Sequence, residues 1–159
     1  MMKDRARLIR EAPRLLETFR DAGYSAGFIV VDRDDTPCAT AVIDEFDETI
    51  RIEARKPLKD RFLFICVAVR GLEAWFLAEG AAIVSALPEV SYQAPRETGS
   101  VDAGTKIRSL WRSKYPGAAF NKIDFAKTIA PKFSPGVATM HSASFNHFWT
   151  KMSAKCGER

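Results

Sequence analysis

Apolar residues recur at helical spacing in the first part of the chain. From Leu8 to Phe19 they line one face of a helix, with arginines at the intervening positions and Gly23 placed to end it. Pro13 lacks a backbone N–H and falls inside this stretch. We therefore expect an amphipathic helix that is kinked or restarted at Pro13.

Two later runs are apolar without interruption. The segments Phe28 to Val31 and Phe62 to Val69 have the pattern of strands that are covered on both faces, as in a parallel sheet. Between them an apolar stripe predicts a helix that is capped by Asp35 or Thr36, with Pro37 in its first turn. The stripe consists of Val42, Ile43, Phe46 and Ile50.

The order of elements predicts an α/β fold. After the second apolar run, the segment RGLEAWFLAEG predicts a short helix that ends near Gly80. Helices and strands thus alternate, which is typical of a small, mostly parallel sheet with flanking helices. We expect this α/β part to occupy about residues 1–88.

The second half of the chain predicts a loop and then helices only. A polar stretch from Glu89 to Ala103 is long enough to suggest a functional loop. Helical spacing follows in three segments, and no boundary leaves two independent cores, so we expect a single domain over residues 1–159 with a helical part at about 103–155. The three segments are Lys106 to Lys114, Lys122 to Ala130, and Ser142 to Met152 with Ser142 as its cap.

Charge is distributed unevenly along the chain. The net charge is +4, but the residues from Val101 onward carry ten Lys or Arg against three acids, whereas the first hundred residues are net acidic. A basic half suits a polyanion such as nucleic acid. The longest apolar run is too short to span a bilayer and the charged N-terminus does not resemble a signal peptide, so we expect a cytoplasmic protein that does not enter a membrane.

Cysteines and histidines offer little for chemistry. The three cysteines have no C-x-x-C spacing and the two histidines are six residues apart, so neither a disulfide framework nor a zinc site is expected. Cys66 falls inside an apolar run, where a buried thiol is expected. The three tryptophans, Trp75, Trp111 and Trp149, share helical faces with other apolar residues and predict core packing.

Carboxylates cluster after the first predicted strand. Asp32 and Asp34 are two positions apart, so in extended backbone they point to the same side and can share a hard divalent cation. In the alternative reading, Asp34 and Asp35 only favour the N-terminus of the next helix through its partial positive charge.

The end of the second predicted strand favours the metal reading. If the strands are neighbours, Arg70 and Glu73 lie at the same edge of the sheet as Asp32 and Asp34. Carboxylates beside a guanidinium predict a site for Mg²⁺ or Mn²⁺ and a phosphate group. Taken one at a time, each residue has a commoner explanation, Glu73 as a solvated first-turn acid and Arg70 as an ordinary surface charge.

The motifs and their order resemble a known family. A strand that ends in Asp32-Arg33-Asp34, then LEAWFLAE, NKIDFAKTIAP and SASFNHF, is similar to uncharacterised TOPRIM-like proteins often encoded beside AAA-type ATPases in bacterial phage-defence loci. The resemblance covers about Gly27 to Met152. It implies a TOPRIM/Rossmann-like fold, an ATPase partner, and Mg²⁺-dependent chemistry on phosphodiesters, as in a nuclease.

The resemblance also implies roles for individual residues. Asp32 and Asp34 match the metal-binding pair and Glu73 matches the acid of the EAW motif, while Lys122 falls where a lysine would neutralise a phosphate. Lys122 is equally explained as a solvated lysine at a helix start. Further candidate contacts for substrate are Lys106 in the basic half, and Tyr92 and Arg96 in the polar stretch.

One departure from the family concerns its N-terminal glutamate. TOPRIM domains begin with a strand followed by a catalytic glutamate, whereas this chain opens in the helix that would come next. Glu11 and Glu17 lie on that helix, so neither inherits the role. A misplaced start or a truncation would explain this, and two-metal catalysis would then be impaired or absent.

Two alternatives to a nuclease follow from the sequence. A degenerate, non-catalytic TOPRIM-like module would bind an ATPase partner or nucleic acid and expose a sheet edge or an apolar patch. A phosphatase of the haloacid-dehalogenase class would use Asp32, Asp34 and Thr36 as its D-x-D-x-T motif. Position 35 is Asp where that class has glycine, and no later acidic pair follows a strand.

Overall fold

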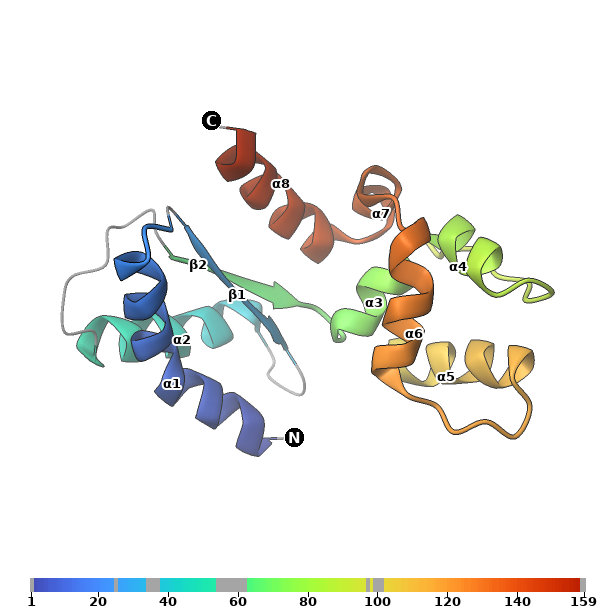
Figure 1. The fold of residues 1–159 in the computed structure, drawn as a ribbon, viewed down its shortest axis with the longest axis horizontal. Coiled ribbons are helices and arrows are strands. Elements are labelled where there is room, and N and C mark those ends of the chain that lie inside the picture. Colours follow the sequence, from blue (N-terminus) through green and yellow to red (C-terminus); the bar gives the residue numbers. More distant parts are fainter. Residues whose placement is uncertain are drawn as a thin grey trace.

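Helices and strands alternate in the first half, and helices alone follow. The structure, a computed structural model, describes residues 2–24, 26–33, 38–53, 63–96, 98 and 102–157. The elements, labelled in Figure 1, are α1 (Met2–Asp21), β1 (Gly27–Asp32), α2 (Ala39–Glu53), β2 (Leu63–Ala68), α3 (Leu72–Leu77), α4 (Gly80–Ala86), α5 (Ala103–Lys114), α6 (Lys122–Ile129), the 3₁₀ turn η2 (Ala130–Lys132), α7 (Pro135–His141) and α8 (Ala143–Gly157).

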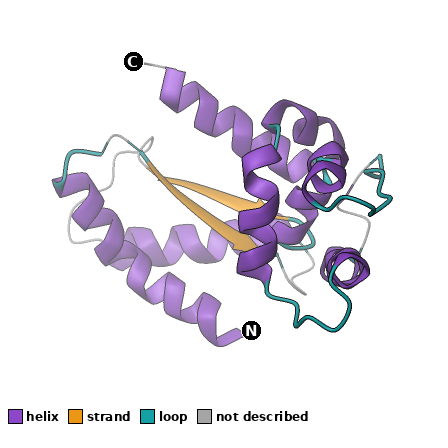
Figure 2. Ribbon diagram, turned by 45° about the vertical axis from the view of Figure 1, so that its right-hand side comes forward, coloured by secondary structure: helices purple, strands orange, loops and turns teal. Residues whose placement is uncertain are grey.

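The two described strands form a parallel sheet. β1 and β2 pair in a register that runs from Gly27 opposite Leu63 to Asp32 opposite Ala68, so both strands end at the same edge. This confirms the predicted parallel pairing. Figures 1 and 2 show that α1 and α2 lie against one face of the sheet and α8 against the other, which explains the uninterrupted apolar runs.

Alternate strand residues supply the two faces. Ile29 and Val31 are buried among residues of α1 and α2, including Phe46, which is fully buried. On the other face the ring of Phe28 meets the edge of Phe148 in α8, with centroids 6.1 Å apart. The predicted stripe of α2 is confirmed, because Val42, Phe46 and Ile50 are buried and Ile43 packs against them.

The first helix differs from its prediction. α1 runs from Met2 to Asp21 with Pro13 inside it, so it begins earlier than Leu8 and does not restart at Pro13. Burial of Ile9, Ala12 and Leu16 against the sheet and α2 compensates for the helix-breaking tendency of proline. Gly23 adopts a positive φ of 86° just after the helix, as expected of a glycine that ends one.

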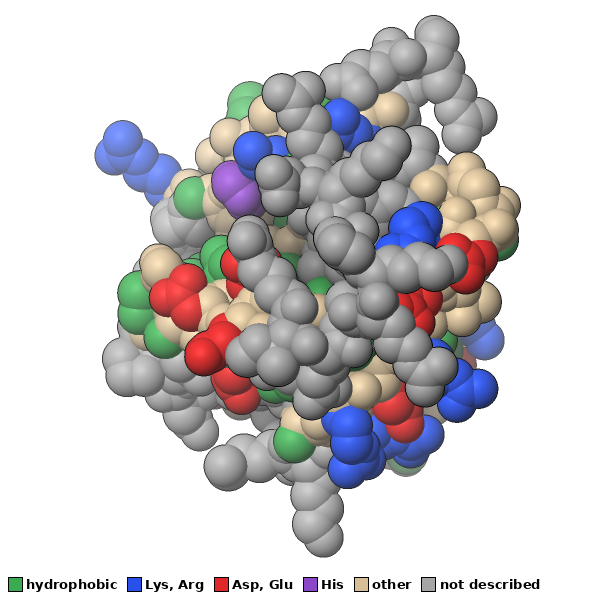
Figure 3. All heavy atoms as spheres, turned by 90° about the vertical axis from the view of Figure 1, so that its left-hand side faces the viewer, with side chains coloured by type: hydrophobic (Ala, Val, Ile, Leu, Met, Phe, Trp, Pro, Cys, Tyr) green, Lys and Arg blue, Asp and Glu red, His purple; other side chains and the backbone are tan. Residues whose placement is uncertain are grey.

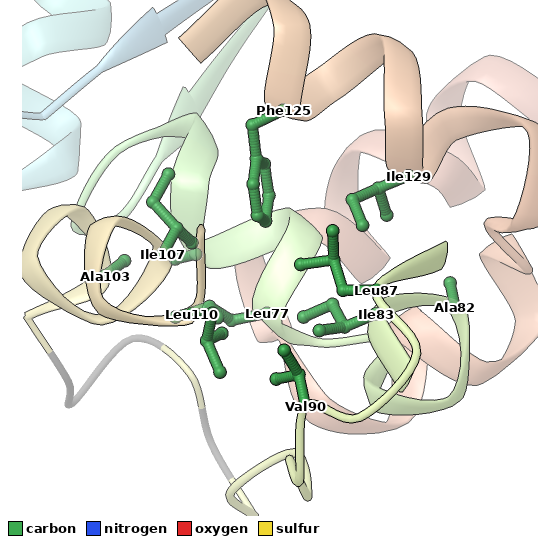
Figure 4. Close-up of a cluster of buried hydrophobic side chains, with 11 residues drawn as sticks. Leu77, Ala82, Ile83, Leu87, Val90, Ala103, Ile107, Leu110, Phe125 and Ile129 are labelled. Carbon is green, nitrogen blue, oxygen red and sulfur yellow. The ribbon is translucent and has the colours of Figure 1, made fainter. Parts of the chain in front are cut away.

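The helices α3 to α6 enclose a second apolar core. Figure 4 shows its side chains converging from α3, α4, α5 and α6, with Phe125 and Ile129 entering from α6. Two of the helices in this half, α4 and α7, were not predicted, and α5 begins at Ala103 rather than Lys106. α8 begins after Ser142, as predicted, and extends beyond Met152 to Gly157.

A third cluster joins the sheet to the C-terminal helices. Trp75 of α3 stacks on Phe148 of α8 with centroids 5.1 Å apart, and its indole N–H donates to Ser144 Oγ at 2.9 Å. Ser144 Oγ also accepts from the backbone N–H of Val69 at 3.4 Å. The motif SASF therefore has a structural role, because it holds α8 against β2 and α3. The predicted core position of Trp75 is confirmed.

Among the described residues, no helix combines the length and apolar character that a bilayer crossing requires.

Candidate functional site at the carboxyl edge of the sheet

A sharp turn connects β2 to α3 at the edge where both strands end. Arg70 and Gly71 have positive φ angles of 64° and 89°, a conformation that costs a non-glycine residue such as Arg70 about 1–3 kcal/mol. The N–H of Gly71 donates to the carbonyl of Ala68 at 3.3 Å, and the N–H of Arg33 donates to the same carbonyl at 3.0 Å. The turn thus brings the start of α3 to the end of β1.

Asp32, the last residue of β1, caps α3 from outside that helix. Its Oδ1 accepts the backbone N–H of Leu72 at 2.8 Å. Gly71 precedes the helix and has no side chain to do this, so the cap comes from the neighbouring strand. The sequence predicted a cap of the next helix by Asp35 or Thr36; those two residues, like Asp34 and Pro37, lie outside the described part of the chain.

Glu73 lies beside Asp32 and is largely buried. Its side chain faces the Cα of Gly71, because a Cβ placed on that glycine would lie 2.7 Å from Glu73 Oε2 and 3.7 Å from Asp32 Oδ2. Oxygens of two carboxylates therefore flank one glycine. Glu73 is only 8% exposed, which is unusual for a glutamate without a partner.

Lys122 is the partner of Glu73. It is the first residue of α6, and its Nζ forms an ion pair with Glu73 Oε1 although the lysine side chain is 66% exposed. An ion pair of this kind offsets the cost of burying a carboxylate. The sequence placed Lys122 near a phosphate; the structure brings it to Glu73, so α6 contributes to the same edge as β1 and α3.

Arg70 belongs to this edge and Lys106 to another surface. Arg70 is exposed, and its charge helps to lower the pKa of Asp102 at the start of α5; the larger cause is the hydrogen bond from the N–H of Thr105. Lys106 lies on α5, where its Nζ is 5.7 Å from the centroid of the Tyr92 ring. Arg96 is exposed within the polar segment.

The side-chain oxygens at the edge are of the type that hard divalent cations bind. Asp32 and Glu73 offer carboxylate oxygens, which Mg²⁺ prefers. In the described part of the chain, no group of three or more His, Cys, Asp or Glu residues is arranged to hold a metal ion. A third carboxylate would have to come from Asp34, which lies outside that part.

Sequence reasoning missed two features of this region. One is the turn at Arg70-Gly71, for which the glycine shortly after a strand is the available signal. The polar residues along α5, including Arg108 and Arg112, were assigned only to a basic half of the chain, because helical periodicity does not tell which neighbour they face.

Comparison with protein-family models, curated proteins and solved structures finds no match for this chain.

Proposed function

We propose that the carboxyl edge of the sheet is a divalent-cation site for phosphodiester chemistry on nucleic acid, in a TOPRIM-like protein. The observation that carries the proposal is the convergence of Asp32 and Glu73 on Gly71, which has no side chain to fill the space between them. Two carboxylates from different elements meet where ligands collect in parallel α/β sheets.

Each charged residue of the edge has a role in this proposal. Asp32 and Glu73, with Asp34, supply oxygen ligands to Mg²⁺ or Mn²⁺, which would polarise a phosphoryl oxygen. Lys122 is held beside Glu73 in the structure. With a cation on the carboxylates, its ammonium group would be free to neutralise a phosphate oxygen. Arg70, exposed in the turn, adds a guanidinium that matches phosphate geometry.

A calorimetric titration of Mg²⁺ and Mn²⁺ tests the site without knowledge of the substrate. Wild type is compared with Asp32→Asn/Glu73→Gln and with a matched control, Asp44→Asn/Glu48→Gln, which removes the same charge from exposed positions of α2. Asn can still accept the N–H of Leu72, so the cap of α3 is kept. Loss of binding only in the first variant supports the site, and equal binding by all three proteins refutes it.

Lys122 supplies a second test of the same site. Because its ammonium group occupies Glu73, Lys122→Met should increase affinity for the cation and decrease cleavage of DNA or RNA. A purely structural ion pair would instead lower stability and leave cation affinity unchanged.

A second candidate function is a non-catalytic module that binds a protein partner such as an AAA-type ATPase. The observation that favours it is that both carboxylates already have protein partners, Leu72 N–H for Asp32 and Lys122 for Glu73. In addition, Leu15, Phe19 and Tyr24 expose large apolar side chains along and just after α1. Absence of cation binding, together with capture of purified ATPase that Phe19→Ser abolishes, would favour this function.

A further inference from the structure

Two adjoining hollows run along α5, lined by residues other than those of the proposed cation site. One, with a volume of about 620 Å³, lies between α5 and the segment 91–95; the other, of about 460 Å³, lies farther along the helix. They share Thr105 and Ser109, so together they form one groove, which we call the α5 groove. Residues 102 to 113 extend over about 16 Å of helix, which is long enough for several nucleotides.

The lining of the α5 groove is basic and rich in hydroxyl groups. Its cations are Lys106, Arg108 and Arg112, all on exposed positions of α5. Hydroxyl groups of Ser91, Thr105, Ser109 and Ser113 lie between and beside these cations. Such alternation of cations and neutral donors is suited to a row of phosphate groups.

Asp102 is the one acid among the described lining residues, against three cations. Its Oδ1 accepts the N–H of Thr105 at 3.0 Å, and this bond, with smaller contributions from Arg108 and Arg70, holds the pKa of Asp102 below its usual value, so the carboxylate stays ionised. The three cations still leave the described lining with an excess of positive charge. On the face shown in Figure 3, by contrast, acidic and basic side chains of described residues are intermixed.

The aromatic wall of the groove is fixed in place rather than open for stacking. Tyr92 donates its hydroxyl to the carbonyl of Leu77 at 3.0 Å, and the ammonium group of Lys106 lies over its ring. The ring is thus occupied by a cation, which leaves phosphate contacts as the main mode of recognition. Binding should show little preference for base sequence.

We propose that the α5 groove binds the sugar-phosphate backbone of a single nucleic-acid strand. The described cations of the groove lie along one helix, α5, and a basic groove of this kind can follow the backbone of one strand. α5 packs against α3, which begins at the β2–α3 turn, so a strand bound along α5 can lead toward the proposed cation site. The groove does not depend on that site, because its cations act without a metal ion.

Fluorescence anisotropy with a labelled single-stranded oligonucleotide, in the presence of EDTA, tests the groove separately from the cation site. The variant Lys106→Gln/Arg108→Gln/Arg112→Gln is compared with Lys127→Gln/Lys132→Gln/Lys151→Gln, which removes the same charge from exposed residues of α6, η2 and α8. We expect wild type to bind with a slope of log K against log salt near −2, from about three phosphate contacts. The groove variant should lose at least about tenfold in affinity and most of that slope, and the control less than about twofold.

Three other results would overturn the proposal. They are absence of binding by wild type, equal losses in the groove variant and the control, and binding of a mononucleotide or a duplex as tight as that of the single strand. Circular dichroism checks that the variants are folded. The single variant Arg112→Gln provides a second check, because Arg112 is exposed and its replacement should lower the slope of log K against log salt by about 0.7 without unfolding the protein. Cation titration of the groove variant should match wild type, so failure of one proposal is distinguishable from failure of the other.

Discussion

Replacing Gly71 by alanine tests the geometry of the β2–α3 turn directly. Gly71 has φ 89° and ψ 164°, a region of backbone space that is essentially restricted to glycine and costs other residues about 1–3 kcal/mol. For a chain of 159 residues, each kcal/mol lowers the melting temperature by about 2–4 °C. The backbone alone should therefore lower the midpoint of Gly71→Ala by about 2–12 °C.

The new methyl group also disturbs the carboxylates. It would lie 2.7 Å from Glu73 Oε2, so the end of that side chain has to move and its ion pair with Lys122 weakens. Because a glutamate side chain is flexible, we expect a modest coupling of about 0.5–1 kcal/mol in a double-mutant cycle of Gly71→Ala with Glu73→Ala. Cation affinity should also fall in the single variant Gly71→Ala.

Two other glycines provide matched controls in urea and thermal unfolding. Gly117 has a positive φ of 82° but no heavy atom within 4 Å of an added Cβ, so Gly117→Ala reports backbone strain alone. Gly136 lies in α7 with the same open surroundings and no positive φ, so Gly136→Ala should be neutral or stabilise by up to about 1 kcal/mol. Additive effects in the cycle, with Gly71→Ala no worse than Gly117→Ala, would refute the contact between Gly71 and Glu73.

Two further predictions concern groups outside the turn. Ser144→Ala should destabilise the protein by about 1–3 kcal/mol in urea unfolding, because the indole N–H of Trp75 loses its acceptor. The control Ser113→Ala, at an exposed position of α5, should have little effect. Equal effects of the two substitutions would contradict the role of Ser144. Burial raises the pKa of Tyr92 to about 12. The stabilising contribution of the neutral Tyr92 side chain should therefore persist below pH 10 and be lost as the pH rises through 12. Ultraviolet titration should show a late tyrosine ionisation that Tyr92→Phe removes, and an unchanged titration in that variant would contradict the assignment.

The sheet and its edge could be predicted from the sequence, because they depend on local hydrophobic patterns and on the rule that neighbouring parallel strands end at the same edge. Continuous β-branched runs predicted two buried parallel strands, and parallel strands end at a common edge, so the approach of Asp32 to Glu73 followed. The capping role of Asp32 did not follow, because the position of its donor, the N–H of Leu72, depends on the turn at Gly71. The partner of Lys122 was equally inaccessible, since nothing in the sequence specifies where α6 packs.

The missed helices have a different cause. α4 and α7 have seven residues each, and helices of that length are marginal in isolation and depend on packing for their stability. In α4 the fully buried Ile83 packs with Leu87 and Leu77, contacts that come from tertiary structure. The start of α7 had a usable signal, Ser134 followed by Pro135 at the first helical position.

The attachment of α8 to the sheet has a consequence for biosynthesis. Ser144 lies 69 residues after Trp75, and α8 leaves the ribosome after every other described element. Until then Phe28, whose ring stacks on Phe64, lacks its contact with Phe148 of α8. A nascent chain with the sheet formed but α8 not yet docked therefore exposes apolar surface that favours aggregation.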